Sequence, residues 1–169
     1  LVQEGFSEKC QTLEVKQGYY VPHFPVIKTS STTTPIRPVF NASSSEQGQL
    51  SLNDTLFKGV WHQTSLLSVL IRWRIHPHVL LTDLRKAFLQ VEVEKVDRPY
   101  LRYLWQDSGR VCAFEMKRLL FGASPSPFLL FAALQRLLEM QAPKLLPLLS
   151  QIYMDDLLIG NTSCANKIY

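Results

Sequence analysis

The order of hydrophobic and polar positions along the chain predicts a mixture of strands and helices. Two extended segments interrupted by prolines, 19–28 and 36–42, predict a pair of edge strands, because proline cannot donate a hydrogen bond to a neighbouring strand. A short apolar run at 78–84 predicts a buried strand that ends in a single aspartate. The segments 100–106 and 111–117 flank the sequence Asp-Ser-Gly-Arg and predict a β-hairpin.

Apolar residues at helical spacing predict two helices. The first covers 63–75, where Thr64 or Ser65 is the candidate N-cap. The second covers 126–141, where Ser126 stands at the N-cap position and a proline follows at the first helical position. Together with the strands, these helices predict an α+β fold with an antiparallel sheet.

Three further segments complete the predicted order of elements. Residues 1–18 are polar and are expected to be mixed loop and helix, and residues 43–54 are expected to be loop. The apolar segment 151–160 reads Gln-Ile-Tyr-Met-Asp-Asp-Leu-Leu-Ile-Gly. It predicts two short strands joined by a turn that holds two adjacent aspartates.

The composition of the 169-residue chain is that of a folded globular protein. Apolar residues make up 46% and charged residues 19%, which provides for a hydrophobic core and excludes wholesale disorder. The 18 Lys and Arg against 14 Asp and Glu give a net charge of +4. That charge is compatible with a polyanionic partner but does not by itself indicate one.

Cysteines and apolar runs exclude several other classes of protein. Cys10, Cys112 and Cys164 are far apart and in no Cys-x-x-Cys spacing, which predicts neither a disulfide framework nor a zinc site and fits a reducing compartment. The longest run without charge, 119–135, contains a glycine and two prolines, so no membrane span is predicted. No signal peptide is recognisable, and both ends look as though they were cut from a longer chain.

Asp155 and Asp156 carry the main candidate chemistry. Aspartates are common in tight turns, but a two-residue hairpin turn favours glycine, and carboxylates beside an apolar core lose hydration at a substantial free-energy cost. A divalent cation would remove that cost, and carboxylate oxygens suit Mg²⁺. Asp83 is a third charge at the end of an apolar run, for which a strand-end or helix-cap role is the plain alternative. Two adjacent strands would gather the three carboxylates at one point, as two-metal phosphoryl transfer requires.

Four groups of motifs follow one another along the chain, the first of which consists of three neighbouring stretches. The sequences YYVPHFPVIK, STTTPIRPVFNAS and SLND come first, followed by LLTDLRKAF, LLFGASPSPFLLFAAL and YMDD. The last three resemble polymerase motifs A, B and C of reverse transcriptases. The first group is most similar to the fingers of reverse transcriptases from Bel/Pao-type long-terminal-repeat retrotransposons. The resemblance runs from about residue 19 to about residue 161.

The resemblance implies roles for individual residues. Asp83, Asp155 and Asp156 would be the catalytic carboxylates and the ligands of two Mg²⁺ ions, with Mn²⁺ as an alternative ion. The residues implied at the incoming deoxynucleotide are Lys28, Arg37, Leu84, Arg85, Lys86, Ala87, Phe88, Phe121 and Gly122, and those implied at the primer and template are Tyr153, Met154 and Ser126.

For three of the residues implied at the nucleotide, the side chain suggests a specific role. Lys28 and Arg37 would grip the triphosphate, because a guanidinium holds two phosphate oxygens and an ammonium acts as a point charge; a solvated edge strand is the alternative. Phe88 would close the sugar pocket and exclude a 2′-hydroxyl, with an ordinary core aromatic as the alternative. Ser126 begins a helix that is expected to be scaffold.

The resemblance also implies an architecture and an activity. The expected fold is a polymerase right-hand palm, an antiparallel sheet packed on helices, with a fingers β-hairpin and truncated before the thumb. An N-terminal segment at 1–18, a fingers-like region at 19–78 and an incomplete palm-like region at 79–169 are expected. The expected activity is RNA-directed DNA polymerase, which adds dNTPs to a primer on an RNA or DNA template.

The setting of the chain follows from the same resemblance. The thumb and ribonuclease H domains of a parent polyprotein have no counterpart here, so the chain alone is expected to polymerise weakly or not at all. A retrotransposon particle in the cytoplasm is the expected location, without a membrane partner.

The sequence departs from the resemblance at several positions. Asn41 stands where an aspartate is usual, Pro38 interrupts the fingers strand, and Met154 is closer to the retroviral form than to the valine common in the Bel/Pao group. These departures bear on fingers geometry and nucleotide affinity rather than on the metal ligands. Two alternatives stay open: a domesticated or decaying remnant that folds and binds nucleic acid without catalysis, and a metal-dependent nuclease, which lacks a histidine near the aspartates in sequence to act as base.

Overall fold

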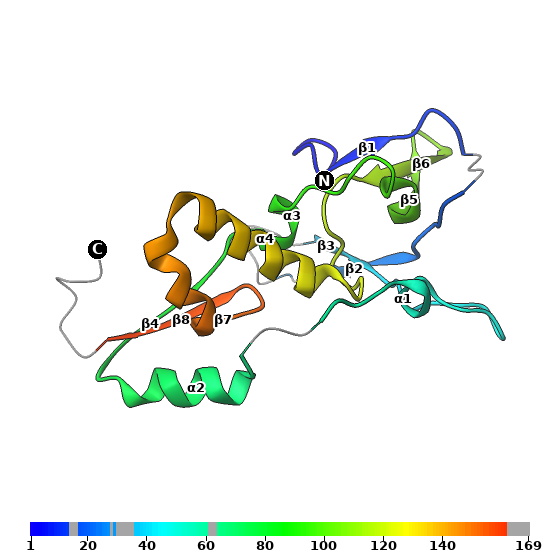
Figure 1. The fold of residues 1–169 in the computed structure, drawn as a ribbon. Helices are drawn as coiled ribbons and strands as arrows, with labels where there is room; N and C mark the ends of the chain where they lie inside the picture. The colour runs from blue at the N-terminus through cyan, green and yellow to red at the C-terminus, as the bar shows by residue number, and fades with distance from the viewer. Residues whose placement is uncertain (14–16, 28, 30–35, 61–63, 162–169) are drawn as a thin grey trace. The chain divides into compact units, whose positions relative to one another are not determined.

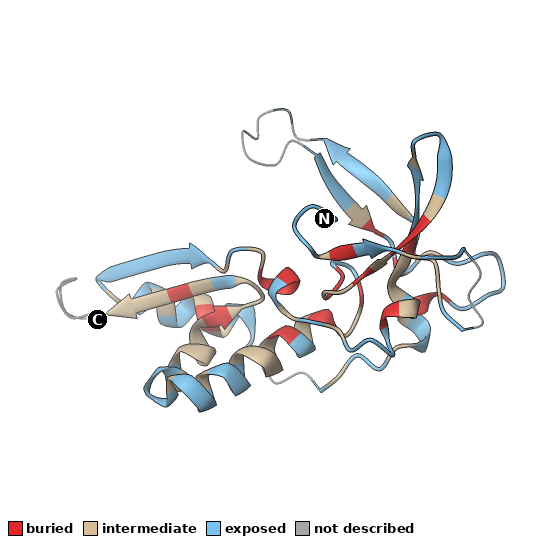
Figure 2. Cartoon of the chain, turned by 90° about the horizontal axis from the view of Figure 1, so that it is seen from above, coloured by how far each residue is buried: buried red, intermediate tan, exposed pale blue. Residues whose placement is uncertain are grey.

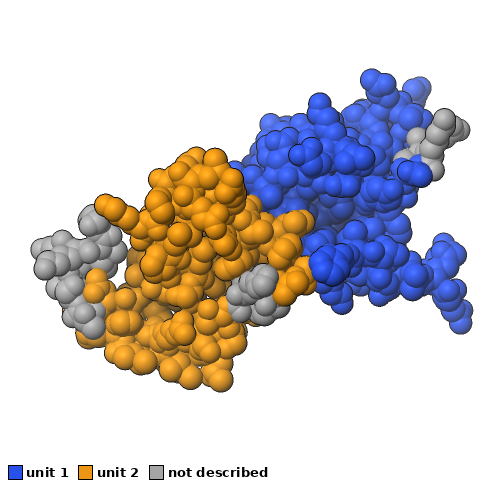
Figure 3. Space-filling model, viewed as in Figure 1, with its two compact units in different colours: residues 1–58, 88–126 blue, residues 59–87, 127–169 orange. Residues whose placement is uncertain are grey.

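The computed structural model describes residues 1–13, 17–27, 29, 36–60 and 64–161. The chain divides into two units, and each is built from two separate stretches of sequence (Figures 1 and 3). Unit 1 comprises Leu1–Lys58 and Phe88–Ser126, and unit 2 comprises Gly59–Ala87 and Pro127–Tyr169. These units are defined by packing, so the predicted division into N-terminal, fingers-like and palm-like regions stays a prediction.

One sheet of unit 1 has the antiparallel strand order β1-β6-β5. The strands are β1 (Ser7–Lys9), β5 (Arg102–Asp107) and β6 (Arg110–Met116). Ser108 and Gly109 join β5 to β6 with positive φ angles of 51° and 80°, as the mirror-image turns of two-residue hairpins require. The hairpin predicted around Asp-Ser-Gly-Arg is therefore confirmed.

The second sheet of unit 1 is an antiparallel pair of strands, β2 (His23–Ile27) and β3 (Ile36–Phe40). Pro25 and Pro38 stand opposite each other in this pair. Proline is tolerated there because, within the described residues, each strand has one edge without a partner. The predicted pair of edge strands is confirmed, while residues 30–35 of its connection lie outside the described residues.

Two expectations for polar segments of unit 1 are wrong. The described part of residues 1–18 contains no helix. It contains the strand β1, in which Ser7 pairs with Met116 of β6. Residues 43–54 are not all loop, because the short helix α1 (Leu52–Thr55) begins there, with the Ser51 hydroxyl as its N-cap. Both elements are too short for a hydrophobic period, and tertiary pairing or a cap decides their structure.

The core of unit 1 is rich in aromatic rings, and its buried segments come from both sheets and from the loops between them (Figure 2). Tyr103 stacks on Phe114 with ring centroids 5.6 Å apart and meets Phe40 edge-on at 5.3 Å. The Tyr103 hydroxyl lies 2.9 Å from the buried Ser7 Oγ, so its polar end is also satisfied. The full cluster comprises Val21, Phe40, Ala42, Leu52, Leu89, Tyr103, Phe114, Met116, Leu120 and Ala123.

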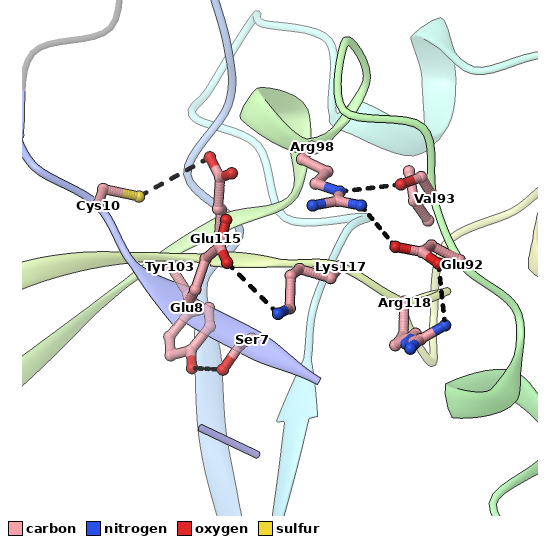
Figure 4. Close-up of polar contacts among 10 residues, drawn as sticks. All are labelled: Ser7, Glu8, Cys10, Glu92, Val93, Arg98, Tyr103, Glu115, Lys117 and Arg118. Carbon is pink, nitrogen blue, oxygen red and sulfur yellow. Dashed lines mark hydrogen bonds and ion pairs between the residues drawn. The ribbon is translucent and has the colours of Figure 1, made fainter. Parts of the chain in front are cut away.

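A buried arginine ties together the loop before β5 (Figure 4). Arg98, the first residue of the 3₁₀ helix η1 (Arg98–Leu101), donates from Nε to the Val93 carbonyl at 2.9 Å and pairs with Glu92 at 2.8 Å. Arg118 pairs with the second oxygen of Glu92 at 3.7 Å. The buried guanidinium therefore has both a charge partner and a backbone acceptor, which offsets its loss of hydration.

Unit 2 is built on a sheet with the antiparallel order β4-β8-β7. Its strands are β4 (His78–Asp83), β7 (Ile152–Tyr153) and β8 (Asp156–Asn161). The helix α2 (Leu66–Ile75) packs against β8 (Figure 1). The predicted strand at 78–84 and the predicted strand-turn-strand at the paired aspartates are both confirmed as elements.

The expected burial of β4 is wrong, since all six of its residues are exposed. Within the described residues β4 pairs only with β8, so it is an edge strand, and Leu81 keeps 59% of its surface exposed. An apolar run shows that a strand is fit for burial, but burial itself requires a neighbour on its open side.

The helices of unit 2 follow the predicted pattern with one difference. Ser65 caps α2, its hydroxyl accepting from the Ser68 N–H at 3.2 Å, as predicted. The helix α4 (Ser126–Gln141) begins at Ser126, which is therefore not an N-cap: its hydroxyl donates to the Leu120 carbonyl at 2.7 Å. A 3₁₀ helix, η2 (Pro143–Gln151), follows. Among the described helices, none has the length and apolar character that a membrane span requires.

Gly160 of β8 allows α2 and the sheet to approach closely. A Cβ at this position would lie 2.9 Å from the His76 Cβ and closer still to its ring. We expect Gly160→Ala to lower the free energy of unfolding by about 1–3 kcal/mol through this overpacking, as measured by urea denaturation. In a His76→Ala background the same change should cost clearly less, because the ring is gone. Equal costs in both backgrounds would contradict the steric explanation.

His23 should make the stability of unit 1 depend on pH. Its ring lies within 5.4 Å of Tyr103 and 5.8 Å of Trp105, and burial lowers the pKa of His23 below its ordinary value of 6.5. The unfolded chain then binds the proton more readily, so stability is greatest above pH 6.5 and falls as the pH decreases through that value. The thermal midpoint should drop between about pH 7.5 and about pH 5.5, and this drop should shrink in His23→Phe. An unchanged pH profile in that variant would exclude His23 as the cause.

Candidate active site

Three aspartates of unit 2 come together at one end of the β4-β8-β7 sheet. Asp83 is the last residue of β4 and pairs directly with Asp156, the first residue of β8. The carbonyl of Asp155 accepts a hydrogen bond from the Leu84 N–H at 2.8 Å. Residues directly opposite each other in an antiparallel pair project from the same face, so the register directs the Asp83 and Asp156 carboxylates to one side of the sheet. The expected adjacency of the two strands is confirmed.

The turn that carries Asp155 is narrow and strained. Tyr153 of β7 pairs with Asp156 of β8, so only Met154 and Asp155 form the turn. Met154 adopts a φ of 58°, a left-handed conformation that a residue with a Cβ rarely takes. The positive φ that such a turn favours is therefore adopted by Met154 and not by a glycine. Strain of this kind persists where the surrounding structure enforces it, and it clusters at functional sites.

The carboxylates are accessible and uncommitted. Asp83 and Asp156 are exposed, and Asp155 is half-buried. Within the described part of the chain, none of the three side chains takes part in a hydrogen bond or an ion pair with another described residue. Their oxygens are therefore available to a ligand from solvent.

A divalent cation is the ligand that this donor set suits. The three side chains offer only hard oxygen donors, which Mg²⁺ prefers. The described residues contain no group of three or more His, Cys, Asp or Glu side chains already arranged to hold a metal ion. The backbone thus brings the three aspartates together, while their side chains are not yet arranged around a common ion position. The two exposed aspartates have the freedom to rotate toward a common ion.

The loop after Asp83 brings positive charge to the same end of unit 2. Leu84, Arg85, Lys86 and Ala87 continue the chain from β4, with Arg85 exposed and Lys86 half-buried at a φ of 54°. The Leu84 N–H is taken up by Asp155, and the Ala87 N–H donates to the Leu84 carbonyl at 3.1 Å. The backbone of Leu84 therefore holds the site together and has no N–H left for a phosphate.

The other predicted nucleotide residues belong to unit 1. Phe88, in the short helix α3 (Ala87–Gln90), is 8% exposed and lies against the Phe121 ring with centroids 4.9 Å apart. Arg37 is exposed on β3, and Lys28 lies outside the described residues. The burial of Phe88 keeps its alternative as a core aromatic open.

The loop before α4 contains a position that only glycine fits. Gly122 has a φ of 94°, and a Cβ there would lie 2.7 Å from the Phe40 carbonyl oxygen. Ser126, at the end of this loop, is buried and bonded to Leu120, which supports the expectation that it is scaffold. No role was predicted for Asn53, although it stands in the SLND stretch; its side chain reaches this loop.

Comparisons with known proteins find similarity among solved structures. No protein-family model and no curated protein sequence matches the chain. The crystal structure of the native prototype foamy virus protease-reverse transcriptase is similar to it, with a TM-score of 0.65 and 20% sequence identity over 96% of this chain and 18% of that chain. At this identity the likeness shows the fold alone. The chain therefore has a mixed α/β fold with antiparallel sheets, similar to part of a reverse transcriptase and spanning about a fifth of that viral protein.

Gly122→Ala should destabilise unit 1 by two separable effects. The positive φ is unfavourable for alanine, and the added Cβ meets the Phe40 carbonyl. Gly109 has a φ of 80°, and an added Cβ there would meet no atom within 4 Å, so it is the matched control for the first effect alone. We expect a loss of about 1 kcal/mol in Gly109→Ala and about 2–4 kcal/mol in Gly122→Ala, measured by urea denaturation. Equal losses would show that the carbonyl contact is unimportant.

Proposed function

We propose that this chain is the fingers and part of the palm of an RNA-directed DNA polymerase, which adds dNTPs to the 3′ end of a primer. The observation that carries the proposal is the direct pairing of Asp83 with Asp156, with Asp155 bonded through its carbonyl to Leu84. The fold likeness to a protease-reverse transcriptase supports it. The motif sequences add the Bel/Pao type, which only the sequence resemblance supports.

The chemistry assigned to the aspartates is two-metal nucleotidyl transfer. Bound Mg²⁺ or Mn²⁺ ions would lower the pKa of the primer hydroxyl and stabilise the leaving pyrophosphate oxygen. Asp83 and Asp155 act as the main ligands and Asp156 as the supporting carboxylate. The short β7–β8 hairpin holds Asp155 and Asp156 in a fixed relation, which reduces the ordering that ion binding requires.

Cations and aromatic residues supply nucleotide binding in this proposal. Arg85 and Lys86 follow Asp83 by two and three residues and would supply positive charge for the triphosphate. Lys28 and Arg37 of the fingers hairpin contribute further charge. Phe88 acts as the steric barrier to a 2′-hydroxyl, supported by its contact with Phe121.

The partners and location belong to the same proposal. An RNA or DNA template with its primer binds near Tyr153 and Met154, and a thumb and a ribonuclease H domain come from a longer polyprotein. A thumb that holds phosphates of the duplex would supply much of the affinity for the primer-template. The setting is a retrotransposon particle in the cytoplasm, without membrane attachment.

A second candidate function has one observation in its favour. The described residues do not present three ligand side chains already gathered for a metal ion, which is what a non-catalytic remnant would also show. Such a remnant would fold and bind nucleic acid without extending a primer. Measurements of metal binding and of primer extension distinguish the polymerase from the non-catalytic remnant.

Primer extension by residues 1–169 joined to the thumb of the parent polyprotein tests the proposal. Asp155→Asn should reduce extension by about a thousandfold, since a ligand of the catalytic ions is lost. Asp107→Asn is the control, because that carboxylate pairs with Lys9 on the surface of unit 1; it should leave extension unchanged. Full extension by Asp155→Asn would exclude the site.

Manganese binding to residues 1–169 alone provides a test that does not depend on polymerase activity. Calorimetric titration with Mn²⁺ should show binding in the unsubstituted chain and in Asp107→Asn, and its loss in Asp83→Asn and Asp155→Asn. Binding that survives both substitutions would show that the ions sit elsewhere. Absence of both binding and extension in the unsubstituted chain would favour the remnant.

A further inference from the structure

The side chain of Asn53 bridges two parts of unit 1 that are far apart in sequence. Its Nδ2 donates to the Gly122 carbonyl at 2.8 Å and to the Ser43 Oγ at 2.8 Å. Its Oδ1 accepts from the Ser124 N–H at 2.7 Å. Its own backbone N–H donates to the Ala42 carbonyl at 2.9 Å. Every hydrogen-bonding group that the side-chain amide offers is therefore engaged, with both N–H groups and the oxygen in use.

The two bonds to the loop have the pattern of a strand partner. Gly122 offers its carbonyl and Ser124 its N–H, and the buried Ala123 lies between them. An amide side chain carries one donor and one acceptor at adjacent positions, so it satisfies both backbone groups at once. Neither a carboxylate nor an ammonium does so, because the first only accepts and the second only donates.

The same loop is held at its other points by unrelated contacts. The Ser126 hydroxyl donates to the Leu120 carbonyl at 2.7 Å, and Gly122 stands where any Cβ would collide with the Phe40 carbonyl. Phe121 lies inside this frame and meets the Phe88 ring at 4.9 Å. With 45% of its surface exposed, Phe121 depends on the backbone that carries it more than on burial for its position.

We infer that Asn53 is a positioning residue for the nucleotide pocket, acting through the loop from Phe121 to Ser124. It sets the backbone on which Phe121 stands, and Phe121 in turn packs against the Phe88 ring that would meet the sugar. The inference rests on the proposed function for its link to nucleotides, whereas the hold of Asn53 on the loop stands on its own contacts. Loss of that hold should weaken dNTP binding and sugar discrimination and leave the metal-bound chemistry of unit 2 intact.

Three variants separate this role from general stability. Asn53→Ala removes all three side-chain bonds. Asn53→Asp keeps an acceptor for the Ser124 N–H but faces the Gly122 carbonyl with a second oxygen. Ser43→Ala is the matched control, because it removes a bond of Asn53 without touching the loop.

Hydrogen exchange on residues 1–169 tests the hold on the loop directly. The Ser124 amide should exchange about tenfold or more faster in Asn53→Ala than in the unsubstituted chain, and by less in Asn53→Asp, because exchange follows local opening. Ser43→Ala should leave it protected. An unchanged Ser124 amide in Asn53→Ala would overturn the inference, whatever the activity of the protein.

Steady-state extension by the thumb-bearing polypeptide tests the link to nucleotides. Asn53→Ala should raise KM for dNTP about tenfold and reduce discrimination against ribonucleotides, with kcat within about twofold, since the loss is one of substrate positioning. Ser43→Ala should match the unsubstituted enzyme. A fall in kcat with unchanged KM and discrimination would overturn the positioning role. An unsubstituted polypeptide that extends no primer would instead overturn the proposed function and the nucleotide link with it, and the exchange result would then stand for the loop alone.

Discussion

The candidate site depends on the register between β4 and β8. Because side chains alternate between the two faces of a strand, a slip of one residue would send the Asp83 side chain to the opposite face from Asp156. Three features lie around this pairing: the bond from the Leu84 N–H to the Asp155 carbonyl next to it, the narrow turn at Met154 and Asp155 that joins β8 to β7, and the close approach of Gly160 and His76. None of the three involves a carboxylate group, so backbone and packing place the charges.

Local signals in the sequence were sufficient where one residue or one turn decides the structure. The β5–β6 hairpin follows from Asp-Ser-Gly, and the start of α2 follows from Ser65. Local sequence signals gave the wrong structure where a partner elsewhere in the chain determines it. Strand β1 exists because Ser7 meets Met116, and Ser126 is not a cap because the Leu120 carbonyl takes its hydroxyl. The competition between a cap and a more distant acceptor is invisible in one sequence.

The backbone positions of the aspartates were predictable from the sequence. Aspartates at the end of one apolar run and in the middle of another indicate two strand ends, and the observed pairing of Asp83 with Asp156 agrees. The orientation of the carboxylates was beyond the sequence, because exposed side chains take their rotamers from whatever they bind. Nor could the sequence show that Asn53 satisfies the Gly122 carbonyl and the Ser124 N–H, since that bond spans most of unit 1.

The three aspartates do not have equal support, and this difference has a consequence for how the site works. Asp155 and Asp156 are joined covalently and share the strained β7–β8 turn, so their relative position changes little. Asp83 ends an edge strand whose residues are all exposed, and it is tied to the hairpin by β-pairing and by the neighbouring Leu84. Edge strands open at a lower free-energy cost than enclosed ones. The geometry of an ion held by all three would therefore depend most on β4. Any structure that covers the exposed apolar residues of β4 would stabilise the proposed metal site without contacting any of the three aspartates.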